Sequence, residues 1–347
     1  MLLQENISLK AYNTFGIDVK ARYFAEFKSV EELSELLVSD SRLTLHDSRL
    51  TPHDSRLVLG GGSNILFTKD IDGLVLKNGV KGISKIKEDD EYVYVQAGAG
   101  ENWHAFVLYC IENGWAGVEN LSLIPGNVGA SPMQNIGAYG VEIKDVFYEL
   151  KALNIEEKTN YTFGVKDCDF GYRESVFKKK YRDQFVILNV TCRLRKKPVF
   201  NTSYGAIEQE LEKMGVKELS IKAVSDAVIH IRSSKLPDPA VTGNAGSFFK
   251  NPEIPLNQYE ILKSSFPGIT GYALENGNVK LAAGWMIEQC GWKGIRRGDA
   301  GCHAQQALVL VNYGNAAGND ILALSEDIQR SVQEKFGVKL EREVNII

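Results

Sequence analysis

Cysteine and histidine are scarce in this sequence, with five of each among 347 residues. The cysteines are odd in number, scattered, and form no Cys-x-x-Cys pair. A disulfide framework is therefore not expected, and a reducing compartment fits this cysteine usage best. No spacing of histidine and cysteine resembles that of a known zinc site, so we also expect no bound metal.

Long apolar runs are missing as well. The longest, such as Ala307–Val311, have the length of a strand, so we expect no transmembrane helix. The first ten residues lack a basic start followed by an apolar run, and we expect no signal peptide. The formal net charge of −4 argues against a nucleic-acid partner, because nucleic acids favour a basic face. These absences predict a cytoplasmic protein without membrane or nucleic-acid partners.

No expected helix opens on a Gly-x-Gly-x-x-Gly pattern, and strands and helices do not alternate regularly. Both absences disfavour a Rossmann domain and indicate an α+β fold. Ser29 and Glu32 predict a capping box for a helix that runs through Leu37. The other expected elements are strands at Leu57–Leu59, Tyr92–Ala97, Phe185–Leu194 and Lys339–Ile347, a helix at Trp103–Glu112, and an amphipathic helix at Asp320–Phe336 that ends at Gly337.

A short repeat interrupts the N-terminal part. Three copies of a seven-residue DSRL unit begin at Asp40, Asp47 and Asp54. They are too short and too polar for a coiled coil, and they contain Pro52. We expect a solvated surface loop with no part in the chemistry.

Two glycine-rich segments are candidates for a phosphate or ring-binding site. GGGSN at Gly60–Asn64 follows an expected strand, and its N–H groups could cradle phosphate oxygens, although a simple tight turn reads the same way. It lacks the Lys-Ser/Thr ending of a P-loop. Asn120–Gly140 is long and poor in charge, and it could lie against a flat ring system or be an ordinary loop. GAGEN at Gly98–Asn102 lies between them, at spacings that suit a dinucleotide.

Three further segments carry reactive side chains. FGYRES at Phe170–Ser175 places an arginine beside a tyrosine, which is a functional pair or a surface pair. NAGSFFKNP at Asn244–Pro252 holds a serine between glycine and two phenylalanines, which suits a proton donor but also a turn. In LEREV at Leu340–Val344, two glutamates share one face of the expected strand, and such a face is usually solvated.

Taken together and in order, these motifs resemble one family, the UDP-N-acetylenolpyruvoylglucosamine reductases. The resemblance covers nearly the whole chain, and the segment around Ser203–Gly205 is similar to the longer of the family's two variants. The motifs that carry it are NTFGID, GGGSN, GAGENW, LIPGNVGASPMQNIGAYG, GYRES, SKLPDP, GNAGSFFKNP, KLAAGWMIEQCG and HAQQALVLVN.

The resemblance implies a fold and a reaction. The fold is α+β, with a two-lobed FAD-binding domain of the vanillyl-alcohol-oxidase type and a third, α+β substrate-binding domain. The reaction is NADPH-dependent, FAD-mediated reduction of UDP-N-acetylglucosamine enolpyruvate to UDP-N-acetylmuramate in peptidoglycan synthesis. No histidine lies near Leu57–Leu66 for covalent attachment, so noncovalent FAD is expected. The expected domains are 1–80 and 81–236 for the FAD lobes, 237–337 for the substrate domain, and 338–347 for a C-terminal strand with a catalytic glutamate.

The resemblance also assigns roles to individual residues. Arg173 would stabilise the substrate carboxylate, Glu343 the enol, and Ser247 would supply the proton. The substrate ligands implied are Tyr172, Tyr204, Lys235, Asn251 and Gln306. The FAD ligands implied are Gly60, Gly61, Gly62, Ser63, Asn64, Pro125, Gly126, Gly129, Ala130, Ser131, Gln134, Asn135, Gly137, Ala138, Tyr139 and Gly140.

The chain departs from the family pattern at the DSRL insertion and at Asn345, where a basic residue is expected. We expect a monomer. Two other readings of the residues stay open. A flavin oxidase acting on an alcohol or sugar would share the FAD segments but would not need GYRES, NAGSFFKNP and LEREV together. A nucleotide-sugar binding protein without catalysis would be colourless.

Overall fold

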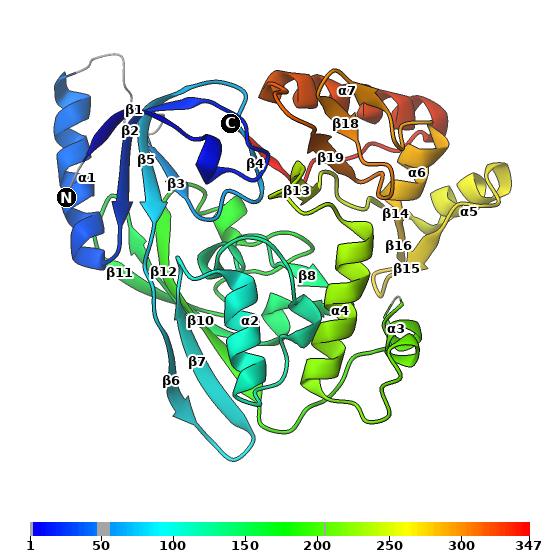
Figure 1. Cartoon of the computed structure of the whole chain (residues 1–347), viewed down its shortest axis with the longest axis horizontal. Helices are drawn as coiled ribbons and strands as arrows, with labels where there is room; N and C mark the ends of the chain where they lie inside the picture. The colour runs from blue at the N-terminus through cyan, green and yellow to red at the C-terminus, as the bar shows by residue number, and fades with distance from the viewer. Residues whose placement is uncertain (1–2, 47–55, 205) are drawn as a thin grey trace. The chain divides into compact units, whose positions relative to one another are not determined.

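The computed structural model describes residues 3–46, 56–204 and 206–347. The chain divides into two compact units (Figure 1). Unit 1 contains Met1–Ile7, Lys20–Gly62 and Ile71–Ser234, and unit 2 contains Ser8–Val19, Ser63–Asp70 and Lys235–Ile347. Each unit therefore draws on segments that are far apart in the sequence.

The first sheet of unit 1 has the order β1-β2-β5-β3, formed by β1 (Gln4–Ser8), β2 (Lys20–Phe27), β5 (Ile71–Asn78) and β3 (Arg56–Leu59). Strand β5 pairs in parallel with both β2 and β3. Helix α1 (Val30–His46) follows β2. It begins as the sequence predicts, because Ser29 Oγ accepts from Glu32 N at 3.2 Å and the Glu32 carboxylate accepts from Lys28 N at 2.6 Å.

Helix α1 shows that the expectation of a loop for the DSRL repeats is wrong at the first copy. The first DSRL copy, Asp40–His46, continues the helix and is not a loop. Nothing between Val30 and His46 is glycine or proline, and once a helix has formed, each further residue adds a backbone hydrogen bond. The second copy lies outside the described residues. The third copy is described from Arg56 on, and there it forms β3, which confirms the strand expected at Leu57–Leu59.

The second sheet of unit 1 is antiparallel, in the order β11-β10-β12-β7-β6. Helix α2 (Trp103–Glu112) has the predicted bounds and buries Trp103 and Phe106 in the same core as Val190 and Leu194 of the sheet. The strands are β6 (Ile83–Glu88), β7 (Tyr92–Gly98), β10 (Phe147–Asn154), β11 (Asn160–Gly164) and β12 (Phe185–Arg195), so both strands predicted here are confirmed.

One apolar cluster joins the two sheets of unit 1. Phe27 of β2 and Leu37 of α1 belong to the same buried cluster as Leu153 of β10 and Leu188 of β12. Burial of side chains this large contributes about 1.5–3 kcal/mol each, so the two lobes are held to each other by packing. The smaller elements of unit 1 are β8 (Gly137–Ala138), β9 (Val141–Glu142) and the 3-10 turns η2 (Glu119–Leu121), η3 (Val128–Ala130), η4 (Ile143–Asp145) and η5 (Val176–Lys178).

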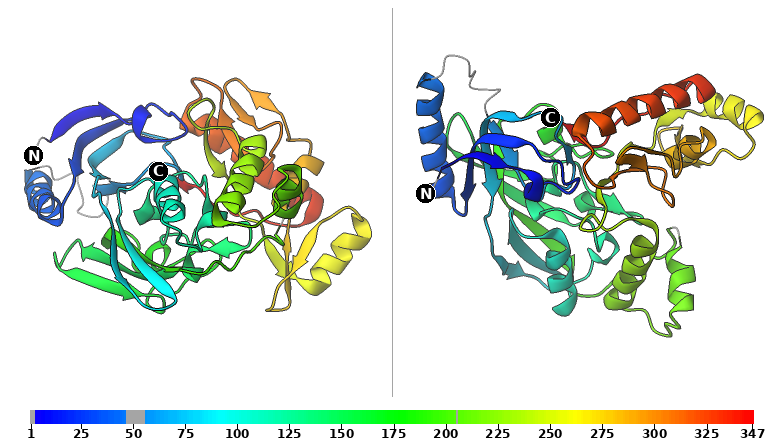
Figure 2. Two further views of the ribbon diagram at one scale, coloured as in Figure 1. Left: turned by 60° about the horizontal axis from the view of Figure 1, so that its bottom comes forward. Right: turned by 45° about the horizontal axis from the view of Figure 1, so that its top comes forward.

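Two helices complete unit 1. Helices α3 (Ile207–Lys213) and α4 (Ile221–Lys235) lie side by side in both views of Figure 2. Ile207 and Leu211 of α3 pack on Ala227, Val228 and Ile231 of α4. The same cluster reaches Tyr139 of the glycine-rich strip, so α4 packs beside that strip.

Unit 2 is built on an antiparallel sheet in the order β13-β19-β18-β17 and a smaller one in the order β14-β16-β15. Helix α7 (Gly318–Phe336) buries Ile321, Leu324, Ile328, Val332 and Phe336, which confirms the predicted face, and Gly337 follows it. The other elements are η1 (Lys10–Tyr12), β13 (Gly243–Ser247), β14 (Glu253–Pro255), α5 (Leu256–Ser265), β15 (Gly271–Ala273), β16 (Asn278–Leu281), α6 (Ala283–Gln289), β17 (Arg296–Arg297), β18 (Ala300–Cys302) and β19 (Val309–Asn312).

The end of the chain is less regular than predicted. Within Lys339–Ile347 the only strand is β20 (Asn345–Ile346), which pairs in parallel with β4 (Ile65–Leu66), and Arg342 forms an isolated bridge with Phe249. The physical reason is a change of partner. Residues 341–343 bond to residues 248–250, whereas residues 345–347 bond to residues 64–68.

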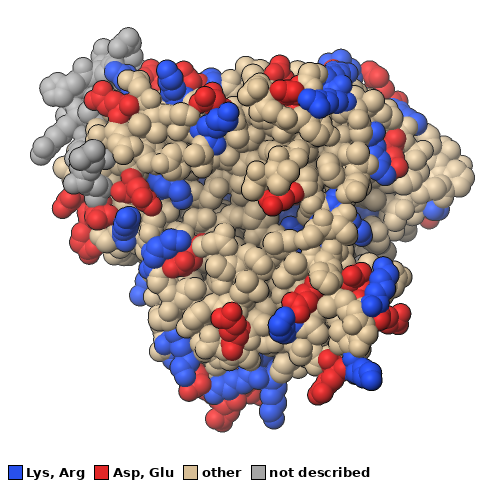
Figure 3. All heavy atoms as spheres, viewed as in Figure 1, with Lys and Arg blue, Asp and Glu red and all other residues tan. Residues whose placement is uncertain are grey.

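None of the helices that the structure describes combines the length and apolarity needed to cross a bilayer. On the face shown in Figure 3, acidic and basic side chains are interspersed.

Candidate active site

The two glycine-rich segments predicted for the cofactor meet in unit 1. A Cβ atom added at Gly61 would lie 2.9 Å from Gly126 Cα and 2.8 Å from Asn127 Oδ1. Real Cβ atoms do not approach backbone this closely, so only glycine allows these two loops to touch. GGGSN and PGNVG, more than 60 residues apart in the sequence, therefore form one backbone surface.

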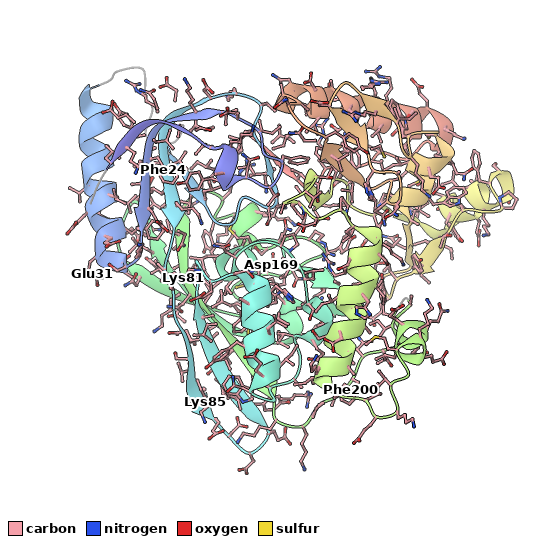
Figure 4. All side chains as sticks on the ribbon, in the orientation of Figure 1. Phe24, Glu31, Lys81, Lys85, Asp169 and Phe200 are labelled. Carbon is pink, nitrogen blue, oxygen red and sulfur yellow. The ribbon has the colours of Figure 1, made fainter. Side chains whose placement is uncertain are left out.

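GAGEN joins the same surface. Asn127 Nδ2 donates to Gly100 O at 3.0 Å, Val128 N donates to Glu101 O at 2.8 Å, and Trp103 N donates to Gly126 O at 2.9 Å. Lys81, labelled in Figure 4, also holds GAGEN, because its Nζ donates to Gly100 O at 2.7 Å. Asn127 thus bonds its own loop to GAGEN and lies against Gly61, and the sequence analysis did not identify it.

This surface has donors that suit a phosphate. Among the residues that the structure describes, the N–H groups of Gly61 and Gly126 donate to no protein acceptor. Both glycines are half-buried, so these N–H groups are open to a ligand such as a phosphate. The residues present therefore fit a dinucleotide cofactor at this place.

Buried amides fasten the rest of the strip. Asn120 Nδ2 donates to Tyr139 O at 2.9 Å and to Asn201 O at 2.8 Å. Asn135 Nδ2 donates to Glu142 Oε2 and to Gly171 O, both at 2.9 Å. Ser131 Oγ donates to Val128 O at 2.7 Å. These buried residues hold the loop, so of the predicted FAD ligands Asn135 and Ser131 have their side chains committed to the protein.

Arg173 is fixed against the same strip. Its Nη2 donates to Gly137 O at 2.6 Å, and its guanidinium carbon lies 5.3 Å from the centre of the Tyr172 ring. The backbone of Arg173 has φ +56°, a left-handed value that costs roughly 1–2 kcal/mol in a non-glycine residue. The turn is closed on both sides, because Gly171 N and Glu174 N each donate to the other's carbonyl oxygen. Such strain often accompanies a functional side chain held in one direction.

Positive φ values recur along the strip, at Leu123 (+58°), Asn135 (+44°) and Tyr139 (+50°). Two side chains hold the Leu123 backbone. Its N–H donates to His104 Nδ1 at 3.0 Å, and its carbonyl accepts from Arg232 Nε at 3.2 Å. Burial, and secondarily the Arg232 charge, lower the pKa of His104, while burial lowers the pKa of the Arg232 guanidinium. His104 therefore accepts this bond as a neutral imidazole, and the sequence analysis identified neither residue.

In unit 2 the structure brings two predicted catalytic residues onto adjacent chain segments. Ser247 ends β13, and the next residue, Phe248, accepts from Glu343 N at 2.8 Å through its carbonyl oxygen. Lys250 N donates to Glu341 O at 2.9 Å, which continues the pairing. Phe248 and Phe249 are buried and anchor the strand, while Ser247 is half-buried. Residues nearly one hundred positions apart in the sequence therefore share one edge.

Asn64, the last residue of GGGSN, meets the same edge. Its Nδ2 donates to Glu343 O at 3.2 Å, and its own carbonyl oxygen accepts from Asn345 N at 3.1 Å and from Asn345 Nδ2 at 2.8 Å. Asn345, where a basic residue was expected, thus binds the turn that carries Asn64.

The predicted amide ligands Asn251 and Gln306 lie at the start of α6. Asn251 Oδ1 accepts from Ala283 N at 3.0 Å, and Gln306 Oε1 lies 3.2 Å from the Cβ position of Gly284 and accepts from Leu308 N at 3.4 Å. Both oxygens face backbone of unit 2. Among the residues that the structure describes, no group accepts from either NH₂, so both are left as donors that suit an anionic ligand.

The remaining predicted residues are more exposed. Lys235 is exposed and ends α4. Tyr204 is 56% exposed, and its ring lies 6.4 Å from that of Tyr139. Arg173, Tyr172 and Tyr204 belong to unit 1, whereas the other predicted catalytic and substrate residues belong to unit 2.

Comparison with known proteins shows the class to which the chain belongs. The family model for an FAD binding domain matches residues 53–158, and the fold defined here is that of an FAD-dependent oxidoreductase. The model for the UDP-N-acetylenolpyruvoylglucosamine reductase C-terminal domain matches residues 238–347. The chain belongs to the family of UDP-N-acetylenolpyruvoylglucosamine reductases.

Family membership rests on curated relatives of that name. Those of Flavobacterium johnsoniae and Amoebophilus asiaticus are each 52% identical over 100% of both chains. That of Pseudomonas putida is 50% identical over 99% of this chain and 98% of its own. The crystal structure of the Thermus caldophilus enzyme, 23% identical, matches 99% of both chains with a TM-score of 0.67, which confirms the expected fold.

The contact between Gly61 and Gly126 predicts the result of a substitution. Gly61→Val would force the two loops apart, and the purified protein should lose most of its yellow colour. Gly164→Val is the matched control, because a Cβ at this residue of β11, outside the proposed FAD surface, would meet only Asp167 Oδ2 at 3.4 Å, and the variant should retain flavin. Flavin absorbance relative to protein absorbance measures the outcome. A fully yellow Gly61→Val protein would show that this loop does not bind the cofactor.

The bond to His104 predicts a pH dependence. The folded pKa of His104 is lowered from 6.5, so the stability that depends on the neutral imidazole is complete above about pH 6.5 and is lost as pH falls through the folded pKa. Protonation at Nδ1 removes the acceptor for Leu123 N, which costs about 1 kcal/mol. Flavin release, followed by fluorescence between pH 8 and about pH 5, should therefore rise at the acid end.

His104→Asn is the control for this titration, because its Oδ1 replaces Nδ1 as an acceptor that does not titrate in this range. It should retain flavin and show a flatter profile. An identical acid profile in His104→Asn and the unaltered protein would exclude His104 as the titrating group.

Proposed function

We propose that this protein reduces UDP-N-acetylglucosamine enolpyruvate to UDP-N-acetylmuramate, a step of peptidoglycan precursor synthesis. The glycine surface of unit 1 would hold FAD noncovalently, and the bound flavin would supply hydride chemistry between NADPH and the terminal carbon of the enolpyruvyl group. The observation that supports this best is the pairing of the Ser247 segment with the Glu343 segment in unit 2. A flavin oxidase would have no need for these two side chains on one edge.

The residue roles follow from the charge that develops. Addition of hydride to the terminal carbon leaves negative charge next to the substrate carboxylate, and the adjoining carbon must then take a proton. We propose that the Ser247 hydroxyl donates this proton and that Glu343 stabilises the enol. Arg173 would bind the carboxylate, for which its fixed, permanently charged guanidinium is suited.

The diphosphate and uridine end of the substrate would be bound by a second group of residues. Asn251 and Gln306 offer NH₂ donors at the start of α6, and Lys235 offers a mobile positive charge. Tyr172 and Tyr204 would contact the substrate from unit 1. The positive charges of Arg173 and Lys235, together with the two neutral donors, match a ligand that has a carboxylate and a diphosphate.

The FAD would occupy the glycine surface of unit 1. Its phosphates would bind Gly60–Asn64, and its ring system the strip from Pro125 to Gly140, with Gly126, Gly129, Ala130, Gln134, Gly137, Ala138 and Tyr139 contributing backbone or side-chain contacts. We retain the boundaries 1–80, 81–236, 237–337 and 338–347 as proposed functional segments. A monomer in the cytoplasm, with no membrane or nucleic-acid partner, completes the proposal.

The role of Ser247 has a direct test. Ser247→Ala should leave reduction of the flavin by NADPH near its normal rate. It should slow flavin reoxidation by the enolpyruvyl nucleotide by about 10²–10⁴-fold, the usual contribution of a general acid. Anaerobic stopped-flow absorbance times the two half-reactions separately.

Ser264→Ala is the matched control, because Ser264 is an exposed helical serine of unit 2 whose Oγ bonds only within α5, to Glu260 O. Both half-reactions should be unchanged in it. Equal slowing of both halves in Ser247→Ala would indicate a structural serine, and no slowing would remove Ser247 from the mechanism.

A further inference from the structure

Strand β13 contains an irregularity immediately before Ser247. Asn244 pairs with Val311 of β19, and Ser247 pairs with Val309. Three steps along β13 therefore match two steps along β19, which leaves one extra residue in β13. Such a β-bulge bends the strand and changes the direction of the side chains beside it. The direction of Ser247 thus depends on how this bulge is held.

The Asn244 side chain holds the bulge. Its Oδ1 accepts from Gly246 N at 3.0 Å, and its Nδ2 donates to Thr242 O at 2.8 Å and to Pro237 O at 3.1 Å. Asn244 is only 3% exposed, so water does not compete for these bonds. Both amide hydrogens and the amide oxygen are in use, which fixes the orientation of the side chain.

The Asn244 side chain holds an unusual backbone conformation at Gly246. The φ of Gly246, +71°, is a left-handed value, and a Cβ placed there would meet nothing within 4 Å. The position therefore requires glycine for its backbone conformation and not for space. The bond from Gly246 N to Asn244 Oδ1 stabilises this conformation one residue before Ser247.

Both ends of the bulge are fixed by other contacts. Asn244 N donates to Thr14 O at 3.0 Å, and Phe248 N donates to Leu308 O at 2.7 Å. Only Ala245, Gly246 and Ser247 lie between these anchors. The Asn244 side chain bonds to the middle one, so it is the contact that selects among the conformations left to this short segment.

We infer that Asn244 is a positioning residue for the Ser247 hydroxyl. Its bonds to the bulge hold that hydroxyl in the direction needed for proton donation. The inference rests on the proposed function, in which Ser247 supplies the proton. Because Nδ2 also bonds to Pro237, two residues after Lys235, the same side chain ties the bulge to the segment proposed to bind the substrate diphosphate.

A general acid must lie within hydrogen-bond reach of the carbon or oxygen that it serves. A displacement of about 1 Å can cost roughly 10²-fold in rate. The loss of Asn244 should therefore affect the step that uses Ser247 and spare the step that does not.

The test uses Asn244→Asp in the full-length, flavin-loaded protein. Aspartate keeps an acceptor for Gly246 N but loses both donors and places a carboxylate against two carbonyl oxygens. Flavin reoxidation by the enolpyruvyl nucleotide should slow by about 10–100-fold, while reduction by NADPH should stay within about twofold. The solvent deuterium isotope effect on reoxidation should rise, because proton transfer becomes more fully rate-limiting.

Asn276→Asp is the matched control. Asn276 Oδ1 makes the same kind of bond, accepting from Asn278 N at 3.0 Å, but in an exposed turn of the β14-β16-β15 sheet. Its half-reactions should equal those of the unaltered protein. If Asn244→Asp fails to fold, Gly246→Ala tests the same bulge, since its added Cβ meets no neighbour and changes only the backbone preference.

A double-mutant cycle separates positioning from general structural support. If Asn244 acts through Ser247, then Asn244→Asp should slow reoxidation no further in a Ser247→Ala background. Additive slowing, equal slowing of both half-reactions, or no slowing in Asn244→Asp would each overturn the inference. If the unaltered protein is not reoxidised by the nucleotide, or if Ser247→Ala does not slow that step, the proposed function or the role of Ser247 fails first, and the two cases are distinguishable.

Discussion

At the turn Gly60–Asn64, the backbone comes close to another backbone segment, and a side chain at the point of contact would keep the two segments apart. At Gly61 the absence of a Cβ lets the turn reach Gly126. Three residues later, Asn64 bonds to the Glu343 carbonyl and to Asn345. The proposed phosphate-binding surface in unit 1 and the edge that carries Glu343 in unit 2 are thus each built on this one short turn. Its sequence is constrained at both ends for different physical reasons.

Several asparagine side chains of this protein hold backbone segments in place. Asn120 and Asn244 each bond main-chain atoms of two or more segments, and Asn127 bonds the main chain of GAGEN. Asn120 and Asn244 are buried and Asn127 is half-buried, so their amides supply bonds that would otherwise need water. The groups proposed for chemistry are few, and their directions depend on these supports. A substitution far from any reacting atom can therefore affect a single step of the reaction.

Local patterns predicted much of the fold. The helix at Trp103–Glu112 and the buried face of α7 follow from periodicity and caps, and the structure confirms both. Contacts made over long sequence distances could not be predicted in this way. The end of the chain changes partner after Glu343, so a period-two pattern there suggested a longer strand than forms. His104 and Asn244 matter because of what they meet in three dimensions, Leu123 and Gly246, and no local pattern marks them. The proposed reactive residues were accessible from the sequence only because their motifs resemble a family.

In the proposed reaction, hydride passes from NADPH through the bound flavin to an enolpyruvyl nucleotide. The most direct measurement is NADPH absorbance under anaerobic conditions, with and without UDP-N-acetylglucosamine enolpyruvate, followed by mass analysis of the nucleotide. We expect sustained NADPH loss only when the nucleotide is present, with one nucleotide gaining two hydrogens for each NADPH consumed. NADPH loss that requires oxygen and leaves the nucleotide unchanged would contradict the proposed reaction.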